Sequence, residues 1–433
     1  MSSDEARDAA EAPPRSPKGT HDVLPPESAR WESLIADYAT LAQRHGFGLA
    51  HTPLFEDARV FRRGIGEASE VVGKEMYEFE DRSGRRLALR PEGTAPIVRA
   101  FVQHHPAVPW RVWYVTPAFR YEQAQAGRYR QHHQLGAEVL GTADPDVDVE
   151  LIALAHDFYR GLGLARIGLR VNSLGDQVCR PGYLDVLRAY LVEHASDLCD
   201  EHAGTWQRNP LRVLDCKRDA CVKATADAPR LGEHLCEPCA THFARVTEGL
   251  DATGIAWQRD ERLVRGLDYY TRTTFEFNAA ALESASDAVG GGGRYDLLAE
   301  ALGGPPTPGI GFGSGIERLL LACDAEGVFP LVEHHADVFV VDATGGGAAR
   351  DLVVALRRAG VRAERAYDAR SMRAQLKVAD RSGAPIALIV GEAERAAGTV
   401  VVRDLVDGTQ RTEPLSGLLE RAAASGRVDG SPA

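Results

Sequence analysis

The stretch Leu263–Phe277 (LVRGLDYYTRTTFEF) concentrates side chains that can bind a small charged ligand. Arg265 and Arg272 flank two adjacent tyrosines, Tyr269 and Tyr270. A guanidinium such as that of Arg265 supplies a fixed cation for a phosphate. The two phenols donate and accept hydrogen bonds, and their flat rings can wall a small pocket. The same pattern also fits a half-buried edge strand whose arginines are solvated, because structural charges commonly mimic sites.

A second group of polar side chains follows two predicted strands. Arg120 ends the aromatic and β-branched strand 110–120, and Glu122 lies just after it. Gln134 and Glu138 lie four residues apart on the strand 134–140, so they share one face. The segment between the strands contributes Arg128, Arg130 and His132.

The turn Pro91–Thr94 (PEGT) connects a predicted strand, 87–90, to a predicted helix, 95–101. Here Glu92 and Thr94 could aim a carboxylate and backbone donors at a ligand. The alternative is a simple helix start capped by Thr94, which accounts for the threonine better than for the glutamate.

Two glycine-rich segments follow the central stretch. Gly290–Asp296 (GGGGRYD) is either a flexible linker or a pocket wall, since glycine lets a ligand approach the backbone closely. Gly309–Arg318 (GIGFGSGIER) has glycine at alternate positions and opens into an apolar helix. It is not a P-loop, because no Gly-Lys-Ser/Thr follows.

In their order along the chain, the motifs resemble those of the histidyl-tRNA synthetases, which are class II aminoacyl-tRNA synthetases of the class IIa group. LVRGLDYYT resembles the histidine-specific motif, RPEGT a substrate loop, FRYE motif 2, QLGAE and GGRYD pocket segments, and GIGFGSGIER motif 3. The resemblance spans nearly everything from Lys18 to the last predicted helix. It implies ATP-dependent activation of L-histidine to histidyl-adenylate, then transfer to the 3′ end of tRNA(His).

The resemblance also implies roles for individual residues. Arg120 and Arg265 would act on the α-phosphate of ATP, and Arg318 with Mg²⁺ on the outer phosphates. Glu92 would take the α-amino group of histidine, and Glu138 would accept the imidazole proton. The other histidine-binding positions implied are Thr94, Gln134, Tyr269 and Tyr270. Further ATP contacts are implied for Glu122, Arg128, Arg130 and His132; alternatively, Glu122 accepts from the motif's own backbone, and Arg128 and Arg130 contact the tRNA acceptor end. His132 departs from the family, which commonly has a phenylalanine there to stack on adenine.

The implied fold is an α+β class II catalytic core, an antiparallel sheet flanked by helices, over residues 17–325. Apolar spacing predicts a helix over Glu27–His45, followed by a glycine break and a strand over His51–Phe55. This layout resembles motif 1, which builds the dimer interface in class II synthetases, so a homodimer is expected. Phe61–Tyr77 contains few hydrophobic residues, and we predict a mobile connection there.

A mostly helical insertion is predicted over 173–252, after a helix at 144–162 and a strand at 167–172. Its Cys216-x4-Cys221 and Cys236-x2-Cys239 pairs approach the spacing of a zinc ribbon, with His234 and His242 as substitute ligands. The alternative is a set of buried, reduced cysteines. The resemblance requires no metal here.

The remaining chain, 331–425, alternates strands and helices, which predicts a compact α/β domain with a largely parallel sheet. It resembles the anticodon-binding domain of the class IIa group. Eight basic residues against three acidic ones between Arg357 and Arg381 favour contact with RNA, although such a run also fits a solvated helix face. Predicted strands are 337–341, 362–364, 386–390 and 400–405; predicted helices are 345–359, 371–382 and 415–424.

Bulk properties exclude several classes of protein. The chain has 433 residues, 44% hydrophobic and 26% charged, which predicts two or three domains of an ordinary globular protein. No apolar run approaches a membrane span, no signal peptide is evident, and seven cysteines form no dense disulfide framework, so a cytoplasmic protein is expected. A net charge of −12 argues against indiscriminate nucleic-acid binding. Disorder is expected at 1–16 and 426–433.

Two alternative functions were weighed. A catalytically inactive, histidine-binding regulatory subunit of histidine biosynthesis shares this fold, but such paralogues typically lack the anticodon domain and have degraded motifs 2 and 3. A generic nucleotide-binding scaffold leaves the paired tyrosines unexplained. Because Arg120, Arg265 and Arg318 are all present, the histidine-specific ligase is the favoured prediction.

Overall fold

The structure, a computed structural model, describes residues 13–66, 69, 71–123, 127–282, 287–331, 335–368 and 370–428. Most of the predicted disordered leader and tail, 1–12 and 429–433, therefore lies outside the described residues. The chain divides into two compact units, Met1–Leu331 and Val332–Ala433. Each is described separately.

An eight-stranded sheet in the order β1-β5-β6-β11-β10-β9-β7-β8 organises the first unit. Its inner pairings are antiparallel, and β1 and β8 add to β5 and β7 in parallel. The strands are β1 (Gly48–Leu49), β5 (Trp110–Phe119), β6 (Gln131–Leu140), β7 (Ile167–Ser173), β8 (Gln258–Arg259), β9 (Thr271–Ala279), β10 (Ala288–Arg294) and β11 (Gly309–Gly315). A small sheet in the order β2-β4-β3 comprises β2 (Phe55–Asp57), β3 (Glu78–Glu80) and β4 (Arg86–Leu89). The predicted antiparallel core is confirmed.

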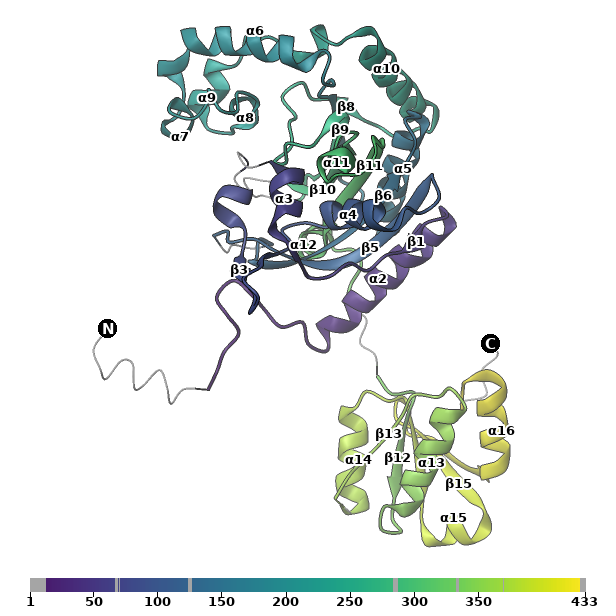
Figure 1. The fold of residues 1–433 in the computed structure, drawn as a ribbon. Helices are drawn as coiled ribbons and strands as arrows, with labels where there is room; N and C mark the ends of the chain where they lie inside the picture. Colours follow the sequence, from purple (N-terminus) through teal and green to yellow (C-terminus); the bar gives the residue numbers. More distant parts are fainter. Residues whose placement is uncertain are drawn as a thin grey trace, which may run out of the picture. The chain divides into compact units, whose positions relative to one another are not determined.

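Helices cover both faces of the large sheet. Helices α2 (Glu27–Arg44), α5 (Asp146–Gly161), α10 (Glu237–Ala252) and α12 (Ile316–Glu326) share one apolar core with the sheet. Helices α3 (Ala58–Ile65), α4 (Thr94–His104), α11 (Leu298–Ala301) and the insertion share a second core with the opposite face. Helices α6 (Arg180–Glu193), α7 (Asp200–Ala203), α8 (Leu211–Asp215) and α9 (Asp219–Ala224) cluster together, whereas α10 runs beside α5 (Figure 1). Short helical turns cover Val71–Glu75, Ala195–Asp197 and Leu231–Glu233.

Strand alternation decides which side chains reach the site. On β6, Leu135, Ala137 and Val139 enter the core formed with α2, α5 and α12. Because successive side chains point to opposite faces, Gln134 and Glu138 face the other side of the sheet. On β9 the same rule buries the phenylalanines on either side of Glu276 and turns the glutamate outward.

The second unit is a five-stranded sheet in the order β13-β12-β14-β15-β16. Its strands are β12 (Val338–Asp342), β13 (Ala363–Arg365), β14 (Ile386–Val390), β15 (Thr399–Asp404) and β16 (Gln410–Pro414); its helices are α13 (Gly347–Arg358), α14 (Met372–Arg381), α15 (Glu392–Ala397) and α16 (Leu415–Ser425). The tail expected to be disordered from residue 426 includes Val428, which is buried in this unit's core.

Three sequence predictions need correction. The strand expected at His51–Phe55 begins only at Phe55, because Pro53 lacks the backbone donor that a strand ladder requires. Within Phe61–Tyr77, α3 continues to Ile65 and buries Phe61, and a helical turn covers Val71–Glu75. The second sheet is mixed, not largely parallel: β12 pairs in parallel with β13 and β14, but β15 and β16 join in antiparallel. The sequence analysis missed β16 and α15.

Candidate active site

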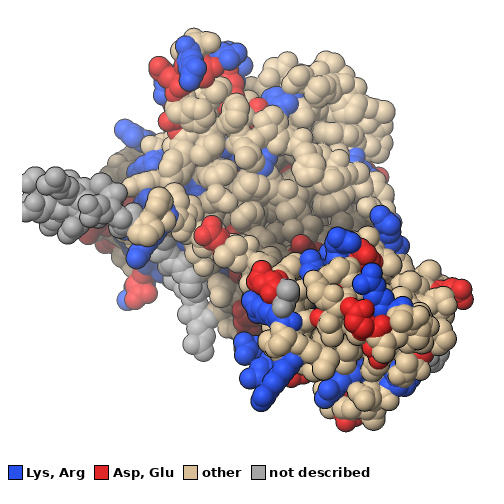
Figure 2. Space-filling view, turned by 90° about the horizontal axis from the view of Figure 1, so that it is seen from below, with Lys and Arg blue, Asp and Glu red and all other residues tan. Residues whose placement is uncertain are grey.

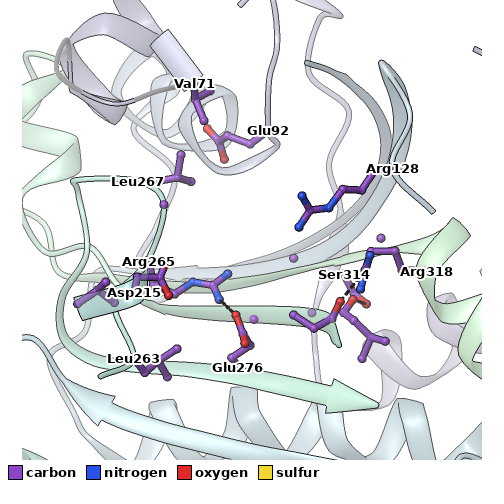
Figure 3. A pocket seen from close by; sticks show the side chains of 18 of the residues that line it. Val71, Glu92, Arg128, Asp215, Leu263, Arg265, Leu267, Glu276, Ser314 and Arg318 are labelled. Carbon is purple, nitrogen blue, oxygen red and sulfur yellow. Dashed lines mark hydrogen bonds and ion pairs between the residues drawn. The ribbon is translucent and has the colours of Figure 1, made fainter. Parts of the chain in front are cut away.

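A cavity of about 1050 Å³ lies over the polar face of the large sheet. Its wall contains most of the predicted site residues, namely Glu92, Thr94, Arg120, Glu122, Arg128, His132, Gln134, Arg265, Tyr269, Tyr270 and Arg318. In Figure 3, Arg128 and Arg265 reach toward this space from opposite sides. Residues from five separate segments of the sequence therefore meet at one site.

Three arginines of the cavity are each oriented by a hydrogen bond. Nε of Arg120 donates to the Pro91 carbonyl at 2.9 Å, and Nε of Arg318 donates to the Ala288 carbonyl at 2.6 Å. Nη1 of Arg265 lies 2.8 Å from Oε2 of Glu276 (Figure 3). Guanidinium groups held in this way present a preorganised positive field to an anionic ligand.

One of these arginines, Arg318, is disfavoured in its charged form. Burial and the neighbouring Arg128 lower the pKa of Arg318. Two cations close together disfavour each other's charged form, and an anion placed between them would relieve this repulsion. This part of the cavity, around Arg128 and Arg318, therefore favours an anionic group such as the phosphates of a nucleoside triphosphate.

Glu138 lies beneath the cavity wall and is fully buried. Oε1 of Glu138 accepts hydrogen bonds from the hydroxyls of Thr94 (2.8 Å) and Tyr114 (3.1 Å), and Oε2 accepts from Tyr295 (2.6 Å). Burial raises the pKa of Glu138 to about 8 despite these donors. Tyr114 and Tyr295 were not predicted from the sequence, because they lie far from Glu138 along the chain and no periodic pattern connects them.

Glu92 caps the helix that follows it. The backbone N–H groups of Thr94 and Ala95 donate to its two carboxylate oxygens, so Glu92, and not Thr94, satisfies the first donors of α4. Burial raises the pKa of Glu92, while these two backbone hydrogen bonds oppose the rise. A carboxylate fixed in this way at the cavity wall can accept further from an ammonium group.

The alternating glycines of β11 make room for polar side chains of the neighbouring strand. Gly311 pairs in register with Glu138 on β6. A Cβ atom at Gly311 would overlap the carboxylate of Glu138, and one at Gly313 would overlap the amide of Gln134. That amide accepts a hydrogen bond from the Gly93 backbone at 3.2 Å. These glycines serve the packing of the site.

Tyr269 and Tyr270 are buried, with ring centroids 4.6 Å apart, just before β9. The Arg265 guanidinium lies 5.9 Å from the Tyr270 ring, and only 21% of its side chain is exposed. Since β9 lies between β10 and β7, the alternative of an edge strand with solvated arginines is wrong.

Only some of the predicted ATP-binding residues between β5 and β6 reach the cavity. Arg128 and His132 line the cavity, and burial with Arg120 nearby lowers the pKa of His132 to about 3. Arg130 does not line the cavity: its guanidinium lies 3.9 Å from the Tyr121 ring centroid, and Nε donates to the Glu122 carbonyl at 3.4 Å. The ATP contact expected for Arg130 therefore lacks support from its position.

Two glutamates at the site were not predicted from the sequence. Glu276 lines the cavity and pairs with Arg265; its position between two buried phenylalanines on β9 was the available signal. Glu317, beside Arg318, accepts from the backbone N–H of His133 at 2.9 Å and lies 2.9 Å from its Nδ1. It therefore joins the start of α12 to β6.

The cysteines of the insertion do not form the predicted four-cysteine set. Among the described residues, Cys216 and Cys221 group with Cys199 and His202. Cys236 and Cys239 group instead with Asp176 and Cys179. The substitutes proposed from sequence take no part, since His242 pairs with Asp148 at 2.9 Å and the ring of His234 lies against Tyr183.

A largely antiparallel sheet with fixed arginines and a substrate cavity on its helix-flanked polar face defines the catalytic fold of class II aminoacyl-tRNA synthetases. Comparison with known proteins agrees. The sequence model of histidyl-tRNA synthetase matches residues 19–319, and that of the anticodon-binding domain matches residues 328–424. The chain belongs to the histidyl-tRNA synthetase family.

Individual relatives resemble the chain over nearly its whole length. The histidine–tRNA ligase of Moorella thermoacetica is 47% identical over 409 residues, covering 93% of this chain and 96% of the relative. The apo histidyl-tRNA synthetase of S. aureus superposes with a TM-score of 0.80 at 33% identity, covering 94% and 99% of the two chains. A Bacillus halodurans protein described as an ATP phosphoribosyltransferase regulatory subunit/histidyl-tRNA synthetase shares the fold, with a TM-score of 0.59 at 22% identity and coverage of 81% and 92%.

Proposed function

We propose that this chain joins L-histidine to tRNA(His) in two steps within the cavity of the first unit. The histidine carboxylate attacks the α-phosphorus of ATP; a new P–O bond gives histidyl-adenylate, and the bond to the β-phosphate breaks to release pyrophosphate. A ribose hydroxyl of the tRNA 3′-terminal adenosine then attacks the activated carbonyl, and AMP leaves. The observation that carries the proposal is the meeting of Arg120, Arg265 and Arg318 with the paired tyrosines at one cavity.

Arg120 and Arg265 hold the α-phosphate between them. No covalent enzyme intermediate is required, so positioning and charge stabilisation account for the catalysis. Arg318 stabilises the charge that develops on the departing pyrophosphate. The bonds to Pro91, Glu276 and Ala288 keep the three guanidiniums in place before ATP arrives.

Histidine binds on the side of the cavity next to Glu138. Glu92 receives the α-amino group, while Thr94, Gln134, Tyr269 and Tyr270 surround the substrate. Glu138 receives the imidazole N–H by way of the Thr94 hydroxyl, which lines the cavity and donates to Oε1 of Glu138. An amino acid without that donor would leave buried polar groups unpaired, which is how such a site rejects analogues strongly.

ATP occupies the remainder of the cavity. His132 stacks on adenine; with its pKa lowered to about 3, its ring is neutral at physiological pH. Glu122 accepts from the adenine amino group, and Arg128 contacts the phosphates. Mg²⁺ fits this chemistry, because the carboxylates of Glu122 and Glu276 line the cavity and Mg²⁺ binds through one or two carboxylates plus substrate phosphates. When bound, it neutralises phosphate charge.

The second unit binds the anticodon region of the tRNA. Exposed basic residues support this: Arg370, Arg373, Lys377 and Arg381 lie just before or on α14, while Arg357 and Arg358 end α13 and Arg362 precedes β13. Figure 2 shows lysine and arginine side chains on this unit, interspersed with acidic ones. We assign 17–325 to the catalytic domain, interrupted by an insertion at 173–252, and 331–425 to the anticodon-binding domain.

In this proposal the enzyme acts as a homodimer, as its resemblance to motif 1 suggests. It works in the cytoplasm. Among the described residues, no helix is both long and apolar enough to cross a membrane.

The decisive experiment is ATP–pyrophosphate exchange with each of the twenty amino acids. Exchange with histidine alone is expected, and tRNA charging with labelled histidine tests the second step. Histidine binding without exchange would instead favour the regulatory-subunit function.

A further inference from the structure

Four potential metal ligands from the insertion converge at the start of α7. Cys199 and His202 are three residues apart; Cys216 directly follows α8, and Cys221 lies within α9. The Cys199 Sγ atom lies 3.9 Å from Sγ of Cys216 and 3.2 Å from Nδ1 of His202. Sγ of Cys221 lies 3.8 Å from the same nitrogen. We call this group the distal cluster.

A second group lies where the insertion leaves and rejoins the sheet. Asp176 and Cys179 follow β7, and Cys236 and Cys239 begin α10. Oδ1 of Asp176 lies 3.6 Å from Sγ of Cys179 and 3.8 Å from Sγ of Cys236. All four ligand atoms lie within 4.8 Å of one another. We call this group the basal cluster.

These separations match tetrahedral zinc. With Zn–S bonds of about 2.3 Å and Zn–N or Zn–O bonds of about 2.0 Å, adjacent ligand atoms lie about 3.5 to 3.8 Å apart. A disulfide requires the two sulfur atoms about 2.05 Å apart, far less than the observed 3.9 Å between Cys199 and Cys216. Six of the seven cysteines belong to the two clusters, and only Cys323 lies elsewhere, in the core of α12.

The surroundings of each cluster suit thiolate ligands. Backbone N–H groups point at sulfur in both: Cys199 donates to Sγ of Cys221, and Asp176 to Sγ of Cys179, each at 3.4 Å. Such donors orient ligands and stabilise their charge. Zinc with three thiolates and one carboxylate carries net negative charge, and Nη2 of Arg272 lies 3.4 Å from Oδ2 of Asp176, whereas the contacts to Cys179 and Cys236 are made by Oδ1.

The short helices between the distal ligands need a further source of stability. Between the distal ligands the chain forms only short helices, α7, α8 and α9, of four to six residues. Helices this short are not stable by themselves in water, and a structural metal commonly holds such segments together.

Each cluster also lies next to the segment that carries the central arginine and tyrosines. At the basal cluster, β7 runs into Leu174 and Gly175, which exchange 2.7 Å backbone hydrogen bonds with Arg272. At the distal cluster, Arg212 on α8 donates to the Gly266 carbonyl at 2.8 Å, and Cys216 itself lines the cavity.

We propose that the insertion holds two structural zinc ions, one in each cluster. The distal ion is bound by Cys199, His202, Cys216 and Cys221. The basal ion is bound by Asp176, Cys179, Cys236 and Cys239. Together they fix the insertion to the segment between Gly266 and Arg272.

The first test is the zinc content of the full chain, purified without chelator and measured by elemental analysis. Two zinc ions per chain are expected. Cys216→Ser should remove the distal ion and Cys236→Ser the basal ion, leaving one each, while the control Cys323→Ala retains both. Fewer than two ions in the unmodified chain, after incubation with zinc and desalting, would overturn the proposal.

A second measurement does not depend on the folding of any variant. Titrating the unmodified native chain with a mercurial reagent, with a zinc-sensitive dye present, should release two zinc ions as six thiolates are modified. Thiol titration of the chain denatured with chelator should then find seven free thiols. A disulfide within either cluster, or thiol modification without zinc release, would refute the assignment and leave plain buried cysteines.

Discussion

The phenol of Tyr295 donates a 2.6 Å hydrogen bond to Oε2 of Glu138, and both side chains are fully buried. Tyr295 follows β10 and Glu138 lies on β6, with β11 between the two strands. The glycine at position 311 leaves the space in which they meet. Burial at this position raises the pKa of Glu138, and the hydrogen bond from Tyr295 only partly opposes the rise.

The pKa of Glu138, raised from 4.5 to about 8 by burial, predicts a specific pH dependence of stability. The folded chain keeps its proton up to about pH 8, whereas the unfolded chain loses it near 4.5. The stabilisation is therefore complete below pH 4.5 and is lost as the pH rises to 8, by at most about 1.4 kcal/mol per unit. Glu138→Gln should lack this component.

Urea unfolding of the first unit at pH 5.5 to 8.5, followed by tryptophan fluorescence, checks this prediction. The difference in free energy of unfolding between the native chain and Glu138→Gln should shift in favour of the variant as the pH rises. A difference that stays constant across the range would contradict the raised pKa.

Arg265→Ala should lower histidine-dependent pyrophosphate exchange about 10²- to 10³-fold, because one preorganised cation on the α-phosphate is lost. Arg265→Lys should recover only part of the activity, since an ammonium lacks the two-pronged geometry of a guanidinium. Arg259→Ala, an exposed site on β8, serves as the control. Normal exchange by Arg265→Ala would disprove the assigned role.

Gly311→Ala should destabilise the first unit by about 1 to 3 kcal/mol, because the added methyl group overlaps the Glu138 carboxylate in a closed core. Gly315→Ala on the same strand is the matched control, since nothing lies closer than 4.0 Å to its added carbon. Urea unfolding compares the two. Equal stability of both variants would show that the site has more space than the structure indicates.

His132→Ala should raise the KM for ATP roughly tenfold, in line with about 1 to 3 kcal/mol for one base–aromatic stack. His132→Phe should leave that KM nearly unchanged, because the ring that stacks in this chain is neutral at physiological pH. Exchange kinetics at saturating histidine measure both. An unaltered KM in His132→Ala would place adenine elsewhere.

Arg373→Ala combined with Lys377→Ala should raise the KM for tRNA in charging without changing pyrophosphate exchange. Losing two phosphate contacts should also make the plot of log affinity for tRNA against log salt concentration less steep, by about one to two in slope. The control pair Arg350→Ala and Arg395→Ala removes equal charge from exposed positions on α13 and α15. Equal losses in both pairs would indicate general electrostatics in place of a specific patch.

The spacing of side chains within single segments predicted several of the main helices and strands. Helix α2 and strands β5 and β6 lie close to their predicted bounds, because long amphipathic spacing and β-branched runs are strong signals within one segment. Weak local signals misled: Phe61–Tyr77 has few hydrophobic residues, yet Phe61 is fully buried against distant segments.

The sequence by itself identified the family, singled out Arg265, Tyr269 and Tyr270, which line one cavity, and predicted the shared face of Gln134 and Glu138. Only the tertiary structure decided which cysteines group together and which hydroxyls surround Glu138. The spacing had joined the Cys216/Cys221 and Cys236/Cys239 pairs into one site, whereas the structure separates them: the first pair lies with Cys199 and His202, and the second with Asp176 and Cys179. Spacing reports on contacts within a turn or strand, but these contacts join segments that meet only when the sheet closes and the insertion folds back on it.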